Sequence, residues 1–390
     1  MMVWAGANLS SYGMASESLE QLAGLSISDR RIRLQIEKVG TARIDEREAA
    51  VTELKRMTLP QRRAGRQAVD APKLAVVMMD GGRYQRRDHF GSEGNSDATH
   101  WRESKVGCLL SMQSQVHLRD PVPLIPDCFA RASVVRQLAK NPTEQGAQGD
   151  GGESPDALMT PPETLSDAAW KQPELLSRDV VASGKDSQAF GWQLESHAWQ
   201  LNFPSAKRQA FVADGAKTNW RIAREHFPRA TAIADLIHAL SYVWSAALAV
   251  GNQTTYQAWA QFVWQGDVQQ VIEQLKEHQS EIGIAPKETA DNDPRVCVSR
   301  CLTYLTNNAS HMNYPEYRRS GLPVTSSHIE STIKPINRRI KGTEKFWLEQ
   351  SSENVLQLRA DYLSASNPMP RFWKRWQAEQ TGSNAYRTAP

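Results

Sequence analysis

Residues 73–80 read KLAVVMMD, in which an uninterrupted apolar run of strand length ends at an acidic residue. Apolar runs that do not alternate with polar residues are typical of strands buried on both faces of a sheet. Gly81 and Gly82 follow, so a tight turn is expected directly after the acid. Residues 208–215, RQAFVADG, repeat the arrangement with Asp214 and a glycine. The chain is therefore expected to contain two buried strands that end in a carboxylate.

The rest of the chain mixes short strand-like segments with a long helical block. We expect strands at 84–90, 105–113 and 230–235, and helices at 219–227, 236–310, 328–341 and 351–364. Strands followed by a helical block and then by an acid-bearing helix predict an α/β core, residues 71–365, with an all-α insertion at 240–312. Residues 366–390 are expected to be a C-terminal tail.

Residues 15–39 predict two short helices that are separated at Gly24, with Ser28 and Asp29 able to cap the second one. The second helix carries a basic cluster, Arg30, Arg31 and Arg33. A helix-turn-helix that docks on DNA fits this pattern, and so does an amphipathic hairpin with a solvated basic face. We assign residues 1–70 to a helical, helix-turn-helix-like segment and linker.

Composition limits the classes of protein that need to be considered. A hydrophobic content of 40% with 12 tryptophans indicates a globular core. The net charge is only +3, so any nucleic-acid surface must come from where the charges lie. The apolar runs are too short or too interrupted to cross a bilayer, and we see no secretory signal, so we expect a cytoplasmic protein without a membrane partner. The four cysteines form no CxxC pair, which favours buried or incidental thiols over a zinc site.

One stretch looks unsuited to a packed core. Residues 141–164 contain five acids, no basic residue and many glycines and prolines. We expect a flexible acidic excursion on the surface, which we extend over 141–190.

Three acids share a distinctive placement: Asp80 and Asp214 end apolar strands, and Glu330 lies in the first turn of the helix at 328–341. Clustered carboxylates without partners repel one another, and divalent cations such as Mg²⁺ relieve that repulsion. Two such ions, roughly 3.5–4 Å apart, can activate an attacking oxygen and stabilise a leaving oxygen in phosphoryl transfer. The glycines after each Asp would let a phosphate backbone approach. The alternative is ordinary Asp-Gly turns and a glutamate favoured by a helix dipole.

Basic residues surround the third acid. On the helix that Glu330 begins they recur every three or four positions, at Lys334, Arg338, Arg339 and Lys341, and Arg318 and Arg319 precede the helix. Such a stripe can bind a polyanion, although basic stripes are often only the solvated face of a helix.

Five segments together carry a family resemblance: VMMDGG around Asp80, HWRESKVGCLLS at 100–111, VADGA around Asp214, DLIHA at 235–239, and YRRSGLPVTSSHIESTIKPINRRIKGTEKFW at 317–347. From about residue 15 to about residue 365 the chain resembles the ISKra-type DDE transposases of bacterial insertion sequences, which are distant relatives of the Mutator-like group. The resemblance implies a ribonuclease-H-like catalytic core with a helical insertion between the second Asp and the Glu.

The resemblance also implies roles. Asp80, Asp214 and Glu330 would bind two Mg²⁺ or Mn²⁺ ions. An activated water would hydrolyse a phosphodiester at the element's end, and the resulting 3′-hydroxyl would attack target DNA. Other positions are expected near the site or on the DNA: Asp235 and His238, which fall at a (C/D)xxH element, and His100, Arg102 and Lys105. The implied partners are terminal inverted repeats, target DNA and further copies of the chain, in a bacterial cytoplasm at the nucleoid.

The chain departs from the family at its start, where a Cys-rich, zinc-ribbon-like stretch is absent. This departure is compatible with an N-terminally truncated copy, with a misassigned start, or with an element that depends on other parts to recognise its ends. Two alternatives stay open: a catalytically inactive or domesticated DNA-binding relic of a transposase, and a structure-selective nuclease with the same core.

Overall fold

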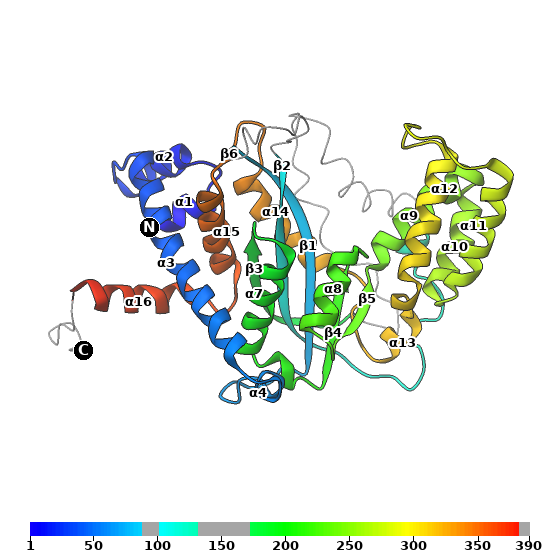
Figure 1. Cartoon of the computed structure of the whole chain (residues 1–390), viewed down its shortest axis with the longest axis horizontal. Coiled ribbons are helices and arrows are strands. Elements are labelled where there is room, and N and C mark those ends of the chain that lie inside the picture. The colour runs from blue at the N-terminus through cyan, green and yellow to red at the C-terminus, as the bar shows by residue number, and fades with distance from the viewer. Residues whose placement is uncertain (88–100, 132–171, 382–390) are drawn as a thin grey trace.

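The computed structural model describes residues 1–87, 101–131 and 172–381. The fold is α/β, with a mixed sheet of six strands between layers of helices (Figure 1). Within these ranges, none of the helices has the length and apolar character that crossing a membrane requires.

The sheet runs in the order β3-β2-β1-β4-β5, and β6 pairs with the end of β1. β2 is antiparallel to β1 and to β3, whereas β4, β5 and β6 continue the sheet with parallel pairing. The strands span Leu74–Arg86 (β1), Trp101–Gln113 (β2), Glu174–Ser183 (β3), Arg208–Ala213 (β4), Thr231–Ala234 (β5) and Phe346–Trp347 (β6).

Helices cover both faces and both ends of the sheet. They span Met2–Asn8 (α1), Tyr12–Ala23 (α2), Asp29–Arg56 (α3), Leu59–Ala64 (α4), Asp127–Ala130 (α5), Ser187–Gln200 (α7), Lys217–His226 (α8), Leu236–Val250 (α9), Gln253–Trp264 (α10), Val268–Ile282 (α11), Pro294–Asn308 (α12), Tyr314–Arg319 (α13), Ser327–Ile340 (α14), Glu349–Leu363 (α15) and Pro368–Thr381 (α16).

Strand β1 is buried on both sides, as its continuous apolar run predicts. Its even-numbered side chains, such as Val76 and Met78, join a core that includes the isoleucines of α14. Its odd-numbered side chains, such as Ala75 and Val77, join a second core under α7 and α8. Because successive residues of a strand point to opposite faces, one strand can serve two hydrophobic cores.

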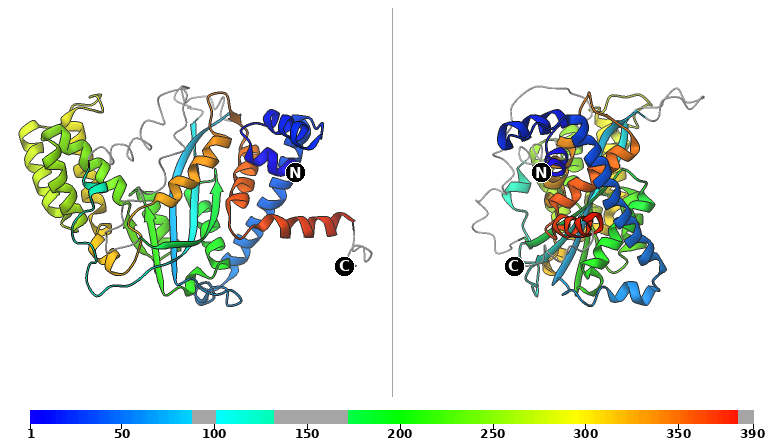
Figure 2. Two further views of the ribbon diagram at one scale, coloured as in Figure 1. Left: turned by 180° about the vertical axis from the view of Figure 1, so that it is seen from behind. Right: turned by 90° about the vertical axis from the view of Figure 1, so that its left-hand side faces the viewer.

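Helices α9 to α12 form a block at one end of the sheet, directly after β5 (Figures 1 and 2). Its interior contains large aromatic side chains, including Tyr256, Trp259 and Trp264, which are almost completely buried. The helical character expected from 236 to about 310 is confirmed.

Two expectations about β1 are wrong. The strand does not end in a tight turn after Asp80, because Gly81 and Gly82 continue the antiparallel ladder with β2 as far as Gln85. Residues 84–86 therefore belong to the same strand and are not a neighbouring one. Residues 88–90 of that expected strand lie outside the described residues.

The expected acidic excursion is also too long. Of the interval 141–190, residues 174–183 form strand β3, and α7 begins at Ser187. The end of β3, from Val180 to Ser183, is buried against β2 and α15, which composition alone does not predict. The part of the excursion up to residue 171 lies outside the described residues.

The N-terminal helices pack on the main body at the end opposite to the α9–α12 block (Figure 1). Gly24 and Ser28 end α2 and cap α3 as expected. However, the second helix is not short, because it continues to Arg56 alongside α15. Its Arg43 pairs with Asp361 of α15 at 2.9 Å, which joins α3 to the core. The helix-turn-helix assignment stays a prediction.

Candidate active site at the carboxyl ends of the parallel strands

Three carboxylates stand at one level along the edge of the sheet. The parallel ladders keep a single register across β1, β4 and β5. Continued by one or two residues, this register sets Asp80, Asp214 and Asp235 side by side. The backbone N–H of Asp235 donates to the Ala213 carbonyl at 2.8 Å, so the alignment holds to this level. Strands far apart in the sequence thus bring three acids to one level, which is the middle of β1 and the carboxyl ends of β4 and β5.

The side chain of Asp80 faces helix α14. It has the same parity along β1 as Met78, which packs in the core that contains α14. Gly82 faces the same way, because a Cβ built there would lie 2.6 Å from Asn337 Oδ1 of α14. A side chain at Gly82 would have to displace the Asn337 amide, so the glycine leaves room for this side chain of α14 beside the strand.

The glycines were expected to make room for a phosphate backbone, and this interpretation is wrong for Gly82 and Gly215. The space beside Gly82 is filled by Asn337, and a Cβ at Gly215 would lie 2.8 Å from Asn308 Nδ2 of α12. Gly215 also has a positive φ of 96°, which strongly favours glycine. Both residues therefore let helices approach the acidic edge.

Glu330 comes from the first turn of α14, which crosses the same face. Its neighbour Ile329 is fully buried in the core and holds this turn in place. The pKa of Glu330 is raised to about 7, mainly by burial and also by the negative charges of Asp235 and Asp80, while His238 and Lys334 oppose the shift. The glutamate therefore shares an electrostatic environment with the acids on the strands.

Asp80 experiences the same environment. Its pKa is raised to about 6, mainly by burial and also by the charge of Asp214, while the hydrogen bond from the Gly81 backbone N–H at 2.6 Å opposes the shift. Asp214 is held by two donors, the Ala216 N–H at 3.0 Å and Asn219 Nδ2 at 2.8 Å. Both aspartates use Oδ1 for these bonds, and among the described residues neither Oδ2 accepts a hydrogen bond.

Asp235 and His238 form a pair beside these acids. Asp235 is fully buried and accepts hydrogen bonds from the backbone N–H groups of Ile237 and Ser326, the Ser326 hydroxyl and His238 Nδ1. It therefore ties the start of α9 to the start of α14. Although burial lowers the pKa of His238, the bond to Asp235 and the charges of Asp235, Asp214 and Asp80 raise it to about 9. His238 thus adds a positive charge close to the carboxylates.

The donor set suits a hard divalent cation. Among the described residues, no donor binds the second carboxylate oxygen of Asp80 or Asp214, and none binds the Glu330 carboxylate. Carboxylate oxygens are the ligands that Mg²⁺ and Mn²⁺ prefer. In the ranges that the structure describes, no three His, Cys, Asp or Glu side chains are grouped closely enough to hold one ion as they stand. The cysteines there are free thiols, and Cys108 and Cys301 are buried.

Most basic candidates for DNA contact lie at the surface. The exposed ones are Arg30, Arg31 and Arg33 on α3, Arg319 at the end of α13, and Lys334 and Arg338 on α14. Lys105 and Arg102 on β2 and Lys341 after α14 are partly exposed. Arg319 is bound by Glu316 at 2.6 Å, and Lys105 by Glu103 at 3.0 Å. Charges at these positions can reach a polyanion, but two of them are already neutralised by carboxylates.

Two basic candidates are wrong. Arg318 has no exposed surface, because its guanidinium stacks 3.8 Å from the Trp264 ring centroid and pairs with Asp120 at 2.5 Å. Arg339 is 2% exposed, and its Nε donates to the Gly6 carbonyl at 2.9 Å. Neither side chain can contact DNA without unpacking. His100 lies outside the described residues.

Sequence reasoning missed two supporting residues. Asn219 holds Asp214 from the first turn of α8, and Ser326 joins Asp235 to the start of α14. Ser326 precedes the first residue of α14, but its side chain makes no cap hydrogen bond to that helix. An asparagine five residues after a strand-end aspartate is the sequence signal that could have identified Asn219.

Comparison with known proteins does not assign the chain. No protein-family model matches it, and no curated protein matches it at a significant level.

Proposed function

We propose that this chain is a DDE transposase, a metal-dependent enzyme that hydrolyses phosphodiesters at the ends of an insertion sequence and joins them to target DNA. The observation that carries the proposal is the register of the parallel strands β1 and β4. Continued by two residues, it sets Asp80, which lies within β1, beside Asp214, which directly follows β4, and Glu330 comes from α14 on the same face. The mixed six-stranded sheet followed by a helical block is compatible with the proposed ribonuclease-H-like core and all-α insertion.

In this proposal the carboxylates of Asp80, Asp214 and Glu330 hold two Mg²⁺ or Mn²⁺ ions. Bound there, the ions would supply Lewis-acid activation of the attacking oxygen and stabilisation of the leaving oxygen. The chain's own residues orient the ligands: Asn219 fixes Asp214, and Asp235 fixes both His238 and the start of α14. The exposed arginines and lysines of α3 and α14 would bind the DNA backbone, and a homo-oligomer would bring two ends together.

The test is an assay of the full chain on duplexes that carry the inverted repeats flanking its reading frame. Asp80→Asn, Asp214→Asn and Glu330→Gln should each lower Mg²⁺-dependent cleavage by about 10³-fold or more, because several kcal/mol of metal-assisted stabilisation would be lost. The control Glu344→Gln changes an exposed acid close to the end of α14 and should leave the rate unchanged.

The outcomes separate the alternatives. Cleavage without joining would identify a structure-selective nuclease. DNA binding by the wild type without cleavage would identify a DNA-binding relic. Cleavage that survives all three substitutions would remove the carboxylates from the mechanism and with them this proposal.

A further inference from the structure

A second site lies on the opposite face of the sheet, in a cavity of about 290 Å³. Its floor is apolar and belongs to the core under α7 and α8, with Ala75 and Val77 of β1, Phe203 and Phe227 among its members. Ala75 and Val77 leave the face opposite to that of Asp80, because they have the opposite parity along β1, and Phe203 and Phe227 pack in the same core as these two residues. The cavity volume is at the lower end of the range for small-molecule sites. It can therefore hold a compact ligand with one flat apolar part.

The rim of the cavity is positively charged. Four arginines and two glutamates line it: Arg62, Arg63, Arg224, Arg229, Glu195 and Glu225. Arg62 is partly neutralised, since its Nη1 lies 3.2 Å from Glu195 Oε1, while Glu195 Oε2 lies 2.7 Å from His226 Nδ1. The Arg62 Nε is nevertheless buried without an acceptor in the described part of the chain. An acceptor from outside the protein would satisfy it.

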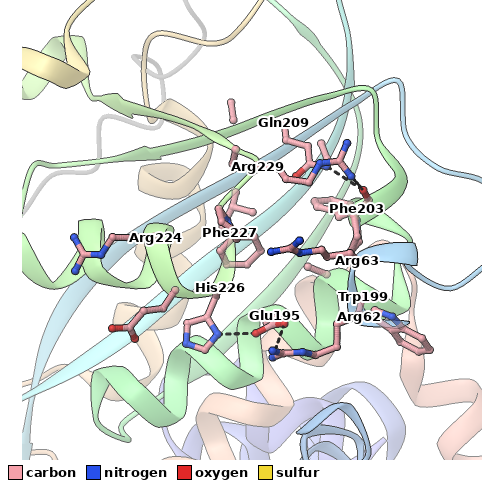
Figure 3. A pocket seen from close by; sticks show the side chains of 18 of the residues that line it. Arg62, Arg63, Glu195, Trp199, Phe203, Gln209, Arg224, His226, Phe227 and Arg229 are labelled. Carbon is pink, nitrogen blue, oxygen red and sulfur yellow. Dashed lines mark hydrogen bonds and ion pairs between the residues drawn. The ribbon is translucent and has the colours of Figure 1, made fainter. Parts of the chain in front are cut away.

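Arg63 is the cation best placed to meet a ligand. Its side chain is exposed, and no described residue accepts a hydrogen bond from it. In Figure 3 it extends over the apolar floor toward Phe227, whereas Arg224 lies apart at the far side. Arg229 is anchored by a hydrogen bond from Nη1 to the Pro204 carbonyl at 2.8 Å (Figure 3). A flat ring on the floor would thus have an unpaired guanidinium beside it.

We propose that this cavity binds a nucleoside monophosphate. The aromatic and aliphatic floor would take the base, and Arg63 with Arg62 would bind the phosphate through charge-assisted hydrogen bonds. Glu225 at the rim is an acceptor for amino groups on the base. This site is separate from the proposed catalytic edge and does not depend on the proposed function.

The experiment is calorimetric titration of the full chain with AMP, GMP, CMP and TMP in EDTA, so that no divalent ion recruits phosphate to the carboxylates. Inorganic phosphate, adenosine and benzoate are titrated separately. Saturable one-to-one binding of at least one monophosphate, tighter than each of the three partial probes, is expected. Arg63→Gln should weaken it about 10- to 100-fold, the usual effect of losing a charged hydrogen-bond donor.

Matched variants locate the site. Arg66→Gln removes an exposed arginine three residues away that does not line the cavity, and Asp80→Asn changes the carboxylate edge. Both should leave the affinity within about twofold, well below the expected effect of Arg63→Gln. The proposal is overturned if no monophosphate binds, if phosphate or benzoate binds as tightly as the nucleotides, or if Arg66→Gln weakens binding as much as Arg63→Gln. Failure of the transposase assay would leave these expectations unchanged.

Discussion

The carboxylate edge and the arginine cavity share strand β1, but their charges are arranged in opposite ways. At the edge, like charges face one another, so that burial and repulsion raise the pKa of Asp80 and Glu330, and His238 is the cation next to them. At the cavity, Glu195 already pairs with Arg62 and His226. The edge is thus short of positive charge, whereas the cavity rim carries an excess of it. A single sheet can separate two such environments because alternate side chains leave opposite faces.

The largest expected effect on stability comes from a substitution within the carboxylate edge itself. Asp235→Ala removes the acceptor of four hydrogen bonds at a fully buried position and leaves His238 without its partner. We expect the free energy of unfolding to fall by about 3–5 kcal/mol, the usual cost of breaking a buried charged pair. Urea denaturation measures it. Glu225→Ala at the exposed cavity rim is the control and should stay within about 0.5 kcal/mol. A loss below about 1 kcal/mol for Asp235→Ala would contradict the role of Asp235 as the link between α9 and α14.

A pH series without divalent ions sharpens the contrast in charge. A group whose pKa is higher in the folded state than in the unfolded state makes its full contribution to stability at pH values below its unfolded-state pKa. This contribution is lost as the pH rises through its folded-state pKa. For Asp80 and Glu330, with ordinary values of 3.8 and 4.5, the window runs from about pH 4 to about pH 7. For His238 it runs from 6.5 to about 9 in the same direction.

Comparison with a variant that lacks both carboxylates isolates their contribution to the pH dependence of stability. The free energy of unfolding of the wild type should fall, relative to that of the Asp80→Asn/Glu330→Gln double variant, by about 2–3 kcal/mol for each of the two carboxylates between pH 4 and pH 7. Mg²⁺ added at pH 7 should stabilise the wild type and not the double variant. If the free energy of unfolding changed with pH in the same way for both proteins, the pKa values of Asp80 and Glu330 would not be raised in the folded state.

A smaller effect is expected where charges are already paired. Glu195→Gln removes the carboxylate between Arg62 and His226 at the cavity. The free energy of unfolding should fall by about 1–2 kcal/mol, since a charged hydrogen-bond acceptor is replaced by a neutral one. Glu316→Gln, which breaks the exposed pair with Arg319, is the matched control and should cost less than about 1 kcal/mol. Equal losses for both variants would mean that the cavity pair is no better shielded than a surface pair.

The smallest effect concerns Arg63. Because this side chain is exposed and bound to no described residue, Arg63→Gln should change the free energy of unfolding by no more than about 0.5 kcal/mol. Thermal and urea denaturation without nucleotide measure this. A larger loss would show that Arg63 stabilises the fold and is not free to bind a ligand.

Local sequence pattern predicted much of the fold, because the signals act over a few residues. The apolar run before Asp80, the break at Gly24, the cap at Ser28 and the late helix that carries Glu330 were all predicted near their observed places. Prediction from local pattern failed where pairing between distant strands determined the structure, as in the continuation of β1 through Gly81 and Gly82. A Gly-Gly pair favours a turn locally, but here twelve residue pairs with β2 keep the strand extended.

Charge shows the same limit. A basic residue within a basic stretch is expected to be exposed at the surface, and Arg338 is indeed exposed. Arg339 is buried because α1 supplies a carbonyl acceptor for its guanidinium, and Arg318 is buried because Trp264 and Asp120 enclose it. These partners lie more than fifty residues away in the sequence. No pattern in the neighbourhood of either arginine contains that information.

By itself, the sequence determined which apolar runs lead into an acid and which late helix carries an acid in its first turn. The tertiary structure alone decided that Asp80, Asp214 and Asp235 share one register, that Gly82 and Gly215 make room for helices, and that an arginine-lined cavity forms behind the acids. The physical reason is that propensity and capping are local free energies. Register, burial and pKa depend instead on which distant segments pack against one another.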